Sequence, residues 1–245
     1  MEVRRIEVVG IPVDHLPEEV FDETVLALAE GKEVRQIIFL SLWNLMRARR
    51  DKELRRTAER ALVIPISRGI QRGAKFLKKI VPERYMPFDF MIIRLFAALE
   101  ARGRSLYILG CRPAELRSIE QNLRQTFPGL RIVGRYTGHY PKSKEKDICV
   151  AIKKASPHCV VLGSGVRGRE KWVDRHRGLF SPGVFIYCPS VLDIISGRKR
   201  KVSRETFQKG LEFVPELITH PWRILRGIVY LYYLILLVFY RIRNK

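Results

Sequence analysis

Closely spaced cysteine pairs of the kind that bind zinc are absent from this 245-residue sequence. Its four cysteines, Cys111, Cys149, Cys159 and Cys188, lie singly, and at least Cys149 and Cys159 fall within apolar runs. We therefore expect reduced thiols in the core rather than a redox or metal site. An apolar segment typical of a signal peptide is also missing after Met1, so a cytoplasmic location is expected.

Acidic residues are scarce in this sequence. It has 25 aspartates and glutamates against 46 lysines and arginines, which gives a net charge of +21. A charge of this sign and size indicates a polyanionic partner, and nucleic acid and anionic lipid both qualify. No Asp-x-Asp pair is present to hold a divalent metal, so neither a metal nor another cofactor is expected.

Apolar runs and helical patterns alternate along most of the chain. Strands are predicted at 6–13, 37–40, 61–66, 105–109, 131–133, 159–162 and 184–187, and helices at 17–31, 42–60, 88–102, 113–127, 145–155 and from Glu170 onward. This alternation predicts an α/β, Rossmann-like fold, with a mostly parallel sheet of about six strands and helices on both faces. We expect residues 1–206 to form the sheet domain and residues 207–245 a basic and apolar C-terminal helical appendage.

The turns that follow parallel strands all lie along one edge of a sheet. That edge is expected to gather Ser67-Arg68-Gly69, Gly110-Cys111-Arg112, Gly138-His139-Tyr140, the loop at Gly163 and Pro189-Ser190. The set is rich in glycine and arginine and poor in carboxylates. It therefore favours an anionic substrate such as a nucleoside diphosphate.

The loop that begins at Gly163 lies between the apolar run Cys159 to Leu162 and the helix expected from Glu170. Glycines let the backbone approach a phosphate closely, and a helix start offers free N–H groups. Arg167 and Arg169 add formal positive charge. The spacing matches neither the dinucleotide fingerprint nor the Walker motif, so a tight turn without a ligand is the alternative.

Arginines crowd the helical segment between Leu42 and Arg60, at Arg47, Arg49, Arg50, Arg55, Arg56 and Arg60. Two interpretations stay open for this segment. It is either a solvated helix face or a basic surface that meets phosphates or lipid headgroups.

No charge interrupts the apolar run from Gly227 to Tyr240, which Arg226 and Arg241 flank. As a helix it would be roughly 21 Å long, shorter than the hydrocarbon core of about 30 Å. We therefore predict an interfacial membrane helix, with Lys199, Arg200 and Lys201 available to anionic lipid. A buried terminal helix or an oligomer contact is the alternative.

An ordered series of short segments resembles the WecG/TagA/CpsF glycosyltransferases (glycosyltransferase family 26) over nearly the whole chain. Each segment is common by itself, and the order makes the series specific. In chain order they are Val8–Asp14, Ala48–Arg55, Leu62–Pro65, Glu83-Arg84 with Asp89, Leu109-Gly110 with Pro113, Phe127–Gly134 with Gly138 and Tyr140, Leu162–Ser164 with Glu170–Trp172, Asp193 with Gly197-Arg198, Gly210–Glu212, and Pro221–Arg223.

The resemblance implies transfer of an N-acetylhexosamine-type sugar from a UDP-sugar to a polyprenyl-diphosphate-linked acceptor, in bacterial cell-envelope polysaccharide biosynthesis. It also implies a site without metal and a peripheral position on the inner face of the cell membrane, where the appendage docks. The donor-binding residues would be Arg84, Gly110, Arg112, Gly163, Ser164, Arg169 and Glu170. Arg198, Arg223 and Arg226 would meet the acceptor or the diphosphates, because a guanidinium binds phosphate oxygens bidentately.

The sequence departs from the family pattern at several positions. Ile66 stands where the family has the aspartate proposed as catalytic base, and an isoleucine cannot take a proton. Phe39 and Ser41 replace the family's Thr-x-Asn, and Gly110–Ala114 replaces Gly-Gly-x-Pro-Gly. The Gly163 loop is two residues longer, with Arg169 in place of glutamine.

The catalytic residue is therefore unassigned. The candidates for a replacement base are Asp89, His139 and Asp193. Asp89 could instead cap its helix, and His139 could be structural.

Three hypotheses follow. The first is a membrane-associated glycosyltransferase of this family with altered acceptor chemistry. The second is a catalytically silent relative that binds a nucleotide-sugar or a lipid-diphosphate. The third, a nucleic-acid-binding protein, lacks an aromatic and basic binding face, so nucleic acid is not the expected partner.

Overall fold

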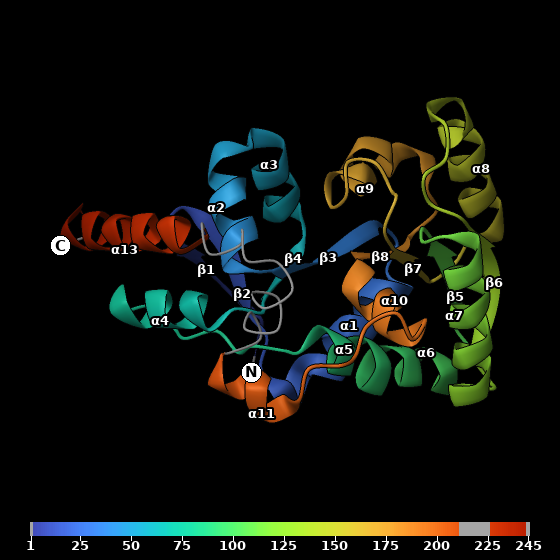
Figure 1. Ribbon diagram of the computed structural model, residues 1–245, viewed down its shortest axis with the longest axis horizontal. Coiled ribbons are helices and arrows are strands. Elements are labelled where there is room, and N and C mark those ends of the chain that lie inside the picture. Colours follow the sequence, from blue (N-terminus) through green and yellow to red (C-terminus); the bar gives the residue numbers. More distant parts are fainter. Residues whose placement is uncertain (1, 211–225, 244–245) are drawn as a thin grey trace.

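Six parallel strands form the central sheet of the computed structural model, which describes residues 2–210 and 226–243 (Figure 1). In their order across the sheet they are β4 (Leu62–Pro65), β3 (Val34–Leu40), β8 (Gly183–Tyr187), β7 (Cys159–Leu162), β5 (Ser105–Leu109) and β6 (Arg131–Tyr136). Every neighbouring pair is parallel. The predicted α/β, Rossmann-like class with about six strands is confirmed.

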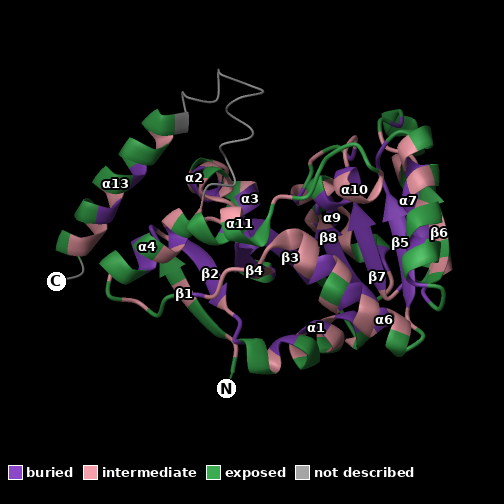
Figure 2. Ribbon diagram, turned by 60° about the horizontal axis from the view of Figure 1, so that its bottom comes forward, coloured by how far each residue is buried: buried purple, intermediate pink, exposed green. Residues whose placement is uncertain are grey.

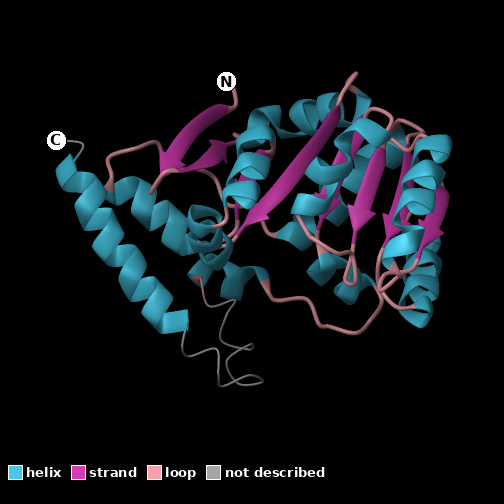
Figure 3. Cartoon of the chain, turned by 90° about the horizontal axis from the view of Figure 1, so that it is seen from above, coloured by secondary structure: helices cyan, strands magenta, loops and turns pink. Residues whose placement is uncertain are grey.

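Helices cover both faces of this sheet, as predicted (Figure 3). One face packs against α1 (Phe21–Glu30), α5 (Pro87–Asp89), the π-helical segment Phe90–Phe96, α6 (Ala97–Ala101), α7 (Pro113–Thr126) and α10 (Pro189–Ile195). The other packs against α2 (Leu42–Arg50), α3 (Lys52–Arg60), α8 (Glu145–Ala155) and α9 (Lys171–His176). Single 3-10 turns occur at Glu18–Val20, Lys142–Lys144 and Arg177–Leu179.

Side chains of successive strand residues point to opposite faces of the sheet. In β3, Ile37 therefore packs into the apolar layer on one face and Ile38 into the layer on the other. A strand buried on both faces needs a continuous apolar run. That requirement explains why β5, β7 and β8, which are buried on both faces, were visible in the sequence. All four cysteines are free and buried, as predicted.

The prediction of one strand at 6–13 is wrong. The segment is an antiparallel hairpin outside the main sheet, made of β1 (Arg4–Val8) and β2 (Ile11–His15). Val9 and Gly10 form the turn with φ angles of 46° and 79°, and a tight type I′ hairpin turn needs two positive φ values. The apolar run continues through the turn, which concealed the reversal.

The hairpin is fastened to β4 through a buried carboxylate. Asp14 is 2% exposed and pairs with the Arg5 guanidinium at 2.8 Å. Its second oxygen accepts a hydrogen bond from the Val63 backbone N–H at 2.7 Å. The hairpin therefore extends the apolar layer that α2 and α3 form on β3 and β4.

The segment predicted as one helix at 42–60 is two helices. Asp51 ends α2 and begins α3, because its carboxylate accepts hydrogen bonds from the backbone N–H groups of Glu53 and Leu54 at 3.1 and 3.0 Å. An aspartate in this position is a typical helix N-cap. The helix predicted at 88–102 is present, with its apolar side buried, although its middle is π-helical.

Among the described residues, three further helices are α4 (Arg68–Phe76), α11 (Arg204–Lys209) and α13 (Arg226–Arg243), and α4 and α13 pack into the apolar layer of α2 and α3. α13 lies beside α2, α4 and the hairpin, far from β6 (Figures 1 and 3). The predicted boundary between residues 206 and 207 falls inside α11. The division into residues 1–206 and 207–245 stays a prediction.

Candidate functional site

Backbone hydrogen bonds join the loops that follow β5, β6 and β7. The N–H of Cys111 donates to the Ser164 carbonyl at 2.8 Å, and that of Gly138 donates to the Cys111 carbonyl at 2.9 Å. His139 donates its N–H to the Gly165 carbonyl at 3.0 Å. Three turns that are far apart in sequence therefore form one rigid block at the carboxyl edge of the sheet.

Glycine is required where these loops touch. A Cβ on Gly110 would lie 2.7 Å from the Gly163 Cα, and the Gly110 φ of +126° disfavours any side chain. A Cβ on Gly138 would lie 2.3 Å from the Ser164 carbonyl oxygen. The glycines therefore bring strand ends together, a structural role that adds to any ligand contact.

The Gly163 loop keeps N–H groups available. Within residues 2–210 and 226–243, the backbone N–H groups of Gly165, Arg167 and Gly168 donate to no hydrogen-bond acceptor, whereas the Ser164 N–H donates to the Cys111 sulfur. Arg167 and Arg169 are exposed beside them, and Arg169 has a φ of +54°. Unpaired N–H groups between a parallel strand and a helix are the arrangement that binds phosphate in α/β folds.

Glu170 ties this loop to the centre of the sheet. Its backbone carbonyl accepts a hydrogen bond from the Gln36 side chain at 2.7 Å, and its Oε1 accepts one from the Asn44 amide at 3.3 Å. Glu170 and Gln36 are 7% and 1% exposed. Burial, with the Glu170 charge as a smaller contribution, raises the pKa of neighbouring Tyr187 to about 12.

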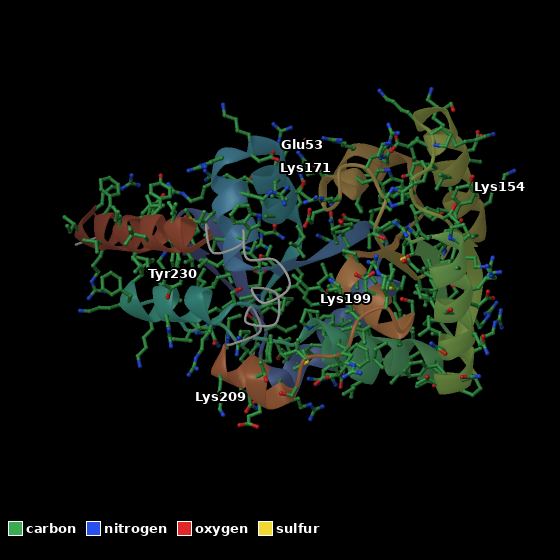
Figure 4. All side chains as sticks on the ribbon, viewed as in Figure 1. Glu53, Lys154, Lys171, Lys199, Lys209 and Tyr230 are labelled. Carbon is green, nitrogen blue, oxygen red and sulfur yellow. The ribbon has the colours of Figure 1, made fainter. Side chains whose placement is uncertain are left out.

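An ionic cluster fastens α9, the helix after the loop, to α3. Lys171 lies 2.8 Å from Asp51 and 3.2 Å from Glu53, and Arg175 pairs with Glu53 at 2.5 Å (Figure 4). Hydrogen bonding to Arg175, and then to Lys171, lowers the pKa of Glu53 to about 2. The pKa of Asp51 is lowered chiefly by its hydrogen bond to Lys171.

The other end of the edge, after β3 and β4, is built from different residues. Ile66 packs half-buried against the core, and Phe39 is buried edge-on against Phe90 with ring centroids 5.0 Å apart. No carboxylate stands at the Ile66 position. This end therefore presents an apolar floor at Ile66 and Phe39.

Arg84 lies at this second end. Its guanidinium donates to the Ile66 carbonyl at 3.4 Å and to the Phe207 and Gln208 carbonyls of α11, and it stacks on the Phe207 ring at 4.0 Å. A pocket of about 700 Å³ opens beside it, between α4, α5 and α11. β3 and β8 separate Arg84 from the Gly163 loop.

The structure separates the three candidate bases. Asp89, in α5, pairs with Lys201 at 2.6 Å and Arg204 at 2.7 Å. Asp193, in α10, is 4% exposed and pairs with Arg198. His139 is exposed, and of the three it alone donates its backbone N–H to the Gly163 loop. Both aspartates are thus held by cations.

Some of the remaining predicted site residues lie in the part of the chain that the structure describes, and others lie outside it. Arg112 begins α7, where its N–H donates to Glu115 at 2.9 Å, and Arg198 lies 3.5 Å from the same carboxylate. Gly110, Arg112, Gly163, Ser164, Arg169, Glu170 and Arg198 therefore gather at one end. Arg223 and the Arg226 side chain lie outside the described residues. No group of three His, Cys, Asp or Glu side chains that could hold a metal occurs in the described part.

α13 packs one face onto the domain. Tyr233 is 1% exposed and donates its hydroxyl to the Gly69 carbonyl at 3.1 Å. The absence of a side chain at Gly73 admits the ring, since a Cβ there would lie 1.8 Å from the Tyr233 hydroxyl. Arg49 and Arg50 of the arginine-rich segment stack on Tyr240 and Tyr232, so part of that segment faces α13.

The opposite face of α13 is apolar and exposed (Figure 2). It carries Ile228, Leu231, Leu234, Ile235, Val238, Phe239 and Ile242. Phe76, the last residue of α4, and Ile80 and Val81 in the segment after α4 are exposed as well. Among the described residues no helix is long and apolar enough to cross a membrane. One face of the helix is therefore buried and the other exposed, and the interfacial membrane helix stays a prediction.

Sequence reasoning missed Gln36, Asn44 and Arg68. Gln36 is an amide inside the apolar run of β3, and that break in the pattern was the available signal. Asn44 shows no signal, because helix surfaces commonly carry asparagine. Arg68 was noted only as part of a turn, and its contact with the Lys209 carbonyl at 2.9 Å spans 141 residues.

Two relatives are named N-acetylglucosaminyldiphosphoundecaprenol N-acetyl-beta-D-mannosaminyltransferase. The one from Bacillus subtilis is 20% identical over 161 residues, 66% of this chain and 62% of the relative, and the one from Bacillus spizizenii is 23% identical over 163 residues with the same coverage. The match thus spans less than two thirds of the relatives' own length. The model of the glycosyl transferase WecG/TagA/CpsF family matches residues 6–245, and the chain belongs to that family.

Proposed function

We propose that this chain transfers a sugar of the N-acetylhexosamine type from a UDP-sugar to a polyprenyl-diphosphate-linked acceptor in cell-envelope polysaccharide synthesis. The observation that carries the proposal is the Gly163 loop, which offers unpaired N–H groups and two exposed arginines at the carboxyl edge of a parallel sheet. Membership of the family and the names of the two relatives support the acceptor chemistry. The diphosphate of the donor becomes the leaving group when the sugar is transferred. The two exposed arginines of this loop would neutralise its negative charge.

We further propose that α13 docks the protein on the inner face of the cell membrane. Its exposed apolar side chains and those of α4 lie beside Lys75, Arg241 and Arg243. Apolar side chains enter the boundary of the acyl chains while cations meet anionic headgroups. This position would bring the site to a lipid-linked acceptor.

A direct test is a transfer assay with the full chain. A panel of UDP-sugars is incubated with a polyprenyl-diphosphate-linked N-acetylglucosamine acceptor in anionic vesicles, and product is measured by mass spectrometry. We expect one UDP-N-acetylhexosamine to give a glycosylated lipid. Retention of a UDP-sugar without product would support binding without turnover, and no retention of any UDP-sugar would contradict the donor site.

The alternative function is a catalytically silent relative that binds a nucleotide-sugar or a lipid-diphosphate. Ile66 and the buried Phe39 favour it, because neither can accept a proton from an acceptor hydroxyl. The Ile66→Asp variant distinguishes an active transferase from a catalytically silent relative. Turnover that appears only in Ile66→Asp would support the silent relative, whereas turnover in the wild-type chain that this variant leaves unchanged would show that another base operates.

A further inference from the structure

The carboxylates near the carboxyl edge of the sheet differ in whether their oxygens are already occupied. Asp89 lies 2.6 and 2.7 Å from two cations, and Asp193 is likewise held by two. Glu115 lies 3.5 Å from Arg198. A hydroxyl must hydrogen-bond to a base before it gives up its proton, so a carboxylate oxygen that a cation occupies is poorly placed for that role.

Glu170 keeps one carboxylate oxygen available. Its Oε1 accepts a hydrogen bond from the Asn44 amide at 3.3 Å, whereas its Oε2 has no hydrogen-bond partner among the residues that the structure describes. The residue is 7% exposed. A buried carboxylate oxygen without a partner is unfavourable, because it has lost its contacts with water and gained none in return. It therefore points to a ligand group that donates a hydrogen bond at this place.

Two amide side chains hold Glu170 in position. Gln36 of β3 donates to its backbone carbonyl at 2.7 Å, and Asn44 donates to its carboxylate. Arg47 in turn donates to the Asn44 Oδ1 at 3.0 Å. Because a guanidinium can only donate, this contact turns the Asn44 oxygen toward Arg47 and the Asn44 nitrogen toward Glu170. A base that is oriented by a fixed neighbour is a common arrangement in catalytic sites.

Glu170 lies where the donor loop meets the helix that follows β3. It directly precedes α9 at the end of the Gly163 loop, and Asn44 belongs to the first turn of α2. A diphosphate bound to the loop would hold its sugar close to this carboxylate. Burial keeps water away, which limits hydrolysis of the donor. The hydrogen bond from Asn44 is long, so the carboxylate can turn toward a hydroxyl when the substrates enter, as catalytic groups often do.

We propose that Glu170 is the catalytic base of the transfer. The acceptor oxygen bonds to C1 of the donor sugar and its proton passes to the Glu170 carboxylate, while the bond from C1 to the diphosphate oxygen breaks and UDP leaves with the electron pair. This inference rests on the proposed function. It gives Glu170 a different role from the donor contact that the family resemblance implies, and it makes Asn44 and Arg47 positioning residues.

The test is the transfer assay on the full chain, with the UDP-sugar that gives product and the lipid-linked acceptor in anionic vesicles. Glu170→Gln keeps the size of the side chain and removes the proton acceptor, and Glu170→Ala leaves room for added formate. Titration with UDP measures the donor affinity of each variant. The matched control is Glu145→Gln, since the half-buried Glu145 accepts a hydrogen bond from Trp172 at 2.8 Å that a glutamine oxygen can replace.

We expect Glu170→Gln to lower kcat at least about 100-fold, because a general base commonly contributes that much. The UDP affinity of this variant should equal that of the wild type, and Glu145→Gln should alter neither quantity. Formate should raise the turnover of Glu170→Ala at least about tenfold, since a small carboxylate can take the proton in place of the missing side chain. Formate should not change the turnover of Glu145→Gln.

Three results would overturn the inference while the proposed function stands. Glu170→Gln could keep wild-type turnover, its UDP affinity could fall as far as its rate, or formate could leave Glu170→Ala inactive. The last two results would assign Glu170 to donor binding or to the structure of the loop. A wild-type chain that binds UDP without turnover would overturn the proposed transfer, and the inference with it.

Discussion

The two ends of the sheet's carboxyl edge are built by different means. At the end after β5, β6 and β7, backbone contacts hold the loops together, because Gly110, Gly138 and Gly163 allow close approach. Some backbone N–H groups there remain available to bind a ligand. The end after β3 and β4 is made of side chains, with Arg68 and Arg84 over an apolar floor at Ile66. A substitution at the first end should therefore damage the fold, and one at the second end should change binding first.

Gly110→Ala should have the largest effect. The new methyl group would lie 2.7 Å from Gly163 backbone atoms at a positive φ, so we expect the free energy of unfolding to fall by about 3 kcal/mol. Urea unfolding of the full chain, followed by tryptophan fluorescence, measures it. Gly178→Ala, where a Cβ meets nothing within 4 Å, should change stability by no more than about 0.5 kcal/mol. An equal loss of unfolding free energy in both variants would refute the claim that close backbone contacts at Gly110 hold this end together.

Gly73→Ala should detach α13 and leave the sheet intact. The added methyl group would overlap the Tyr233 hydroxyl, and losing the burial of that side chain costs about 2 kcal/mol. Hydrogen exchange of residues 228–243 should accelerate at least about tenfold, with β5 and β7 still protected. The control is Gly227→Ala, at a position in α13 that is open to solvent. Unchanged exchange in α13 would show that Tyr233 is not its anchor.

Arg84→Ala should cost little stability. It removes hydrogen bonds to α11 and the stacking on Phe207, all at a partly exposed site, so we expect a loss of about 1 kcal/mol. Trypsin should then cleave after Arg204 or Lys209 faster than in the wild-type chain. A loss as large as that of Gly110→Ala would mean that this end, too, is structural.

Acid should release α9 from α3, and this is the smallest expected effect. The folded-state pKa of Glu53 is about 2, below its ordinary value, so its contribution is complete above about pH 4.5 and is lost as the pH falls toward 2. Urea unfolding at pH 5, 4 and 3 should show a steeper loss for the wild-type chain than for Glu53→Gln. Glu205→Gln, which affects an exposed pair with Lys209, should follow the wild type. Parallel curves for wild type and Glu53→Gln would contradict this role.

The sequence predicted the end after β5, β6 and β7 better than the end after β3 and β4. Strands buried on both faces leave apolar runs, and parallel strands place their following turns together, so Gly110, Gly138 and Gly163 were expected at one edge. The contacts of Arg84 with Phe207 and of Asp89 with Arg204 join residues more than 100 positions apart, and no local pattern encodes them. The hairpin turn at Val9 and the helix break at Asp51 were missed because apolar or helical periodicity runs on through each of them.

We propose that the Gly163 loop binds the donor through its backbone N–H groups. Hydrogen exchange of the full chain with and without UDP tests it most directly. We predict slower exchange at the amides of Gly165, Arg167 and Gly168, with no change at residues 66–69. Binding of UDP that leaves those three amides unprotected, or that protects residues 66–69 instead, would contradict the claim.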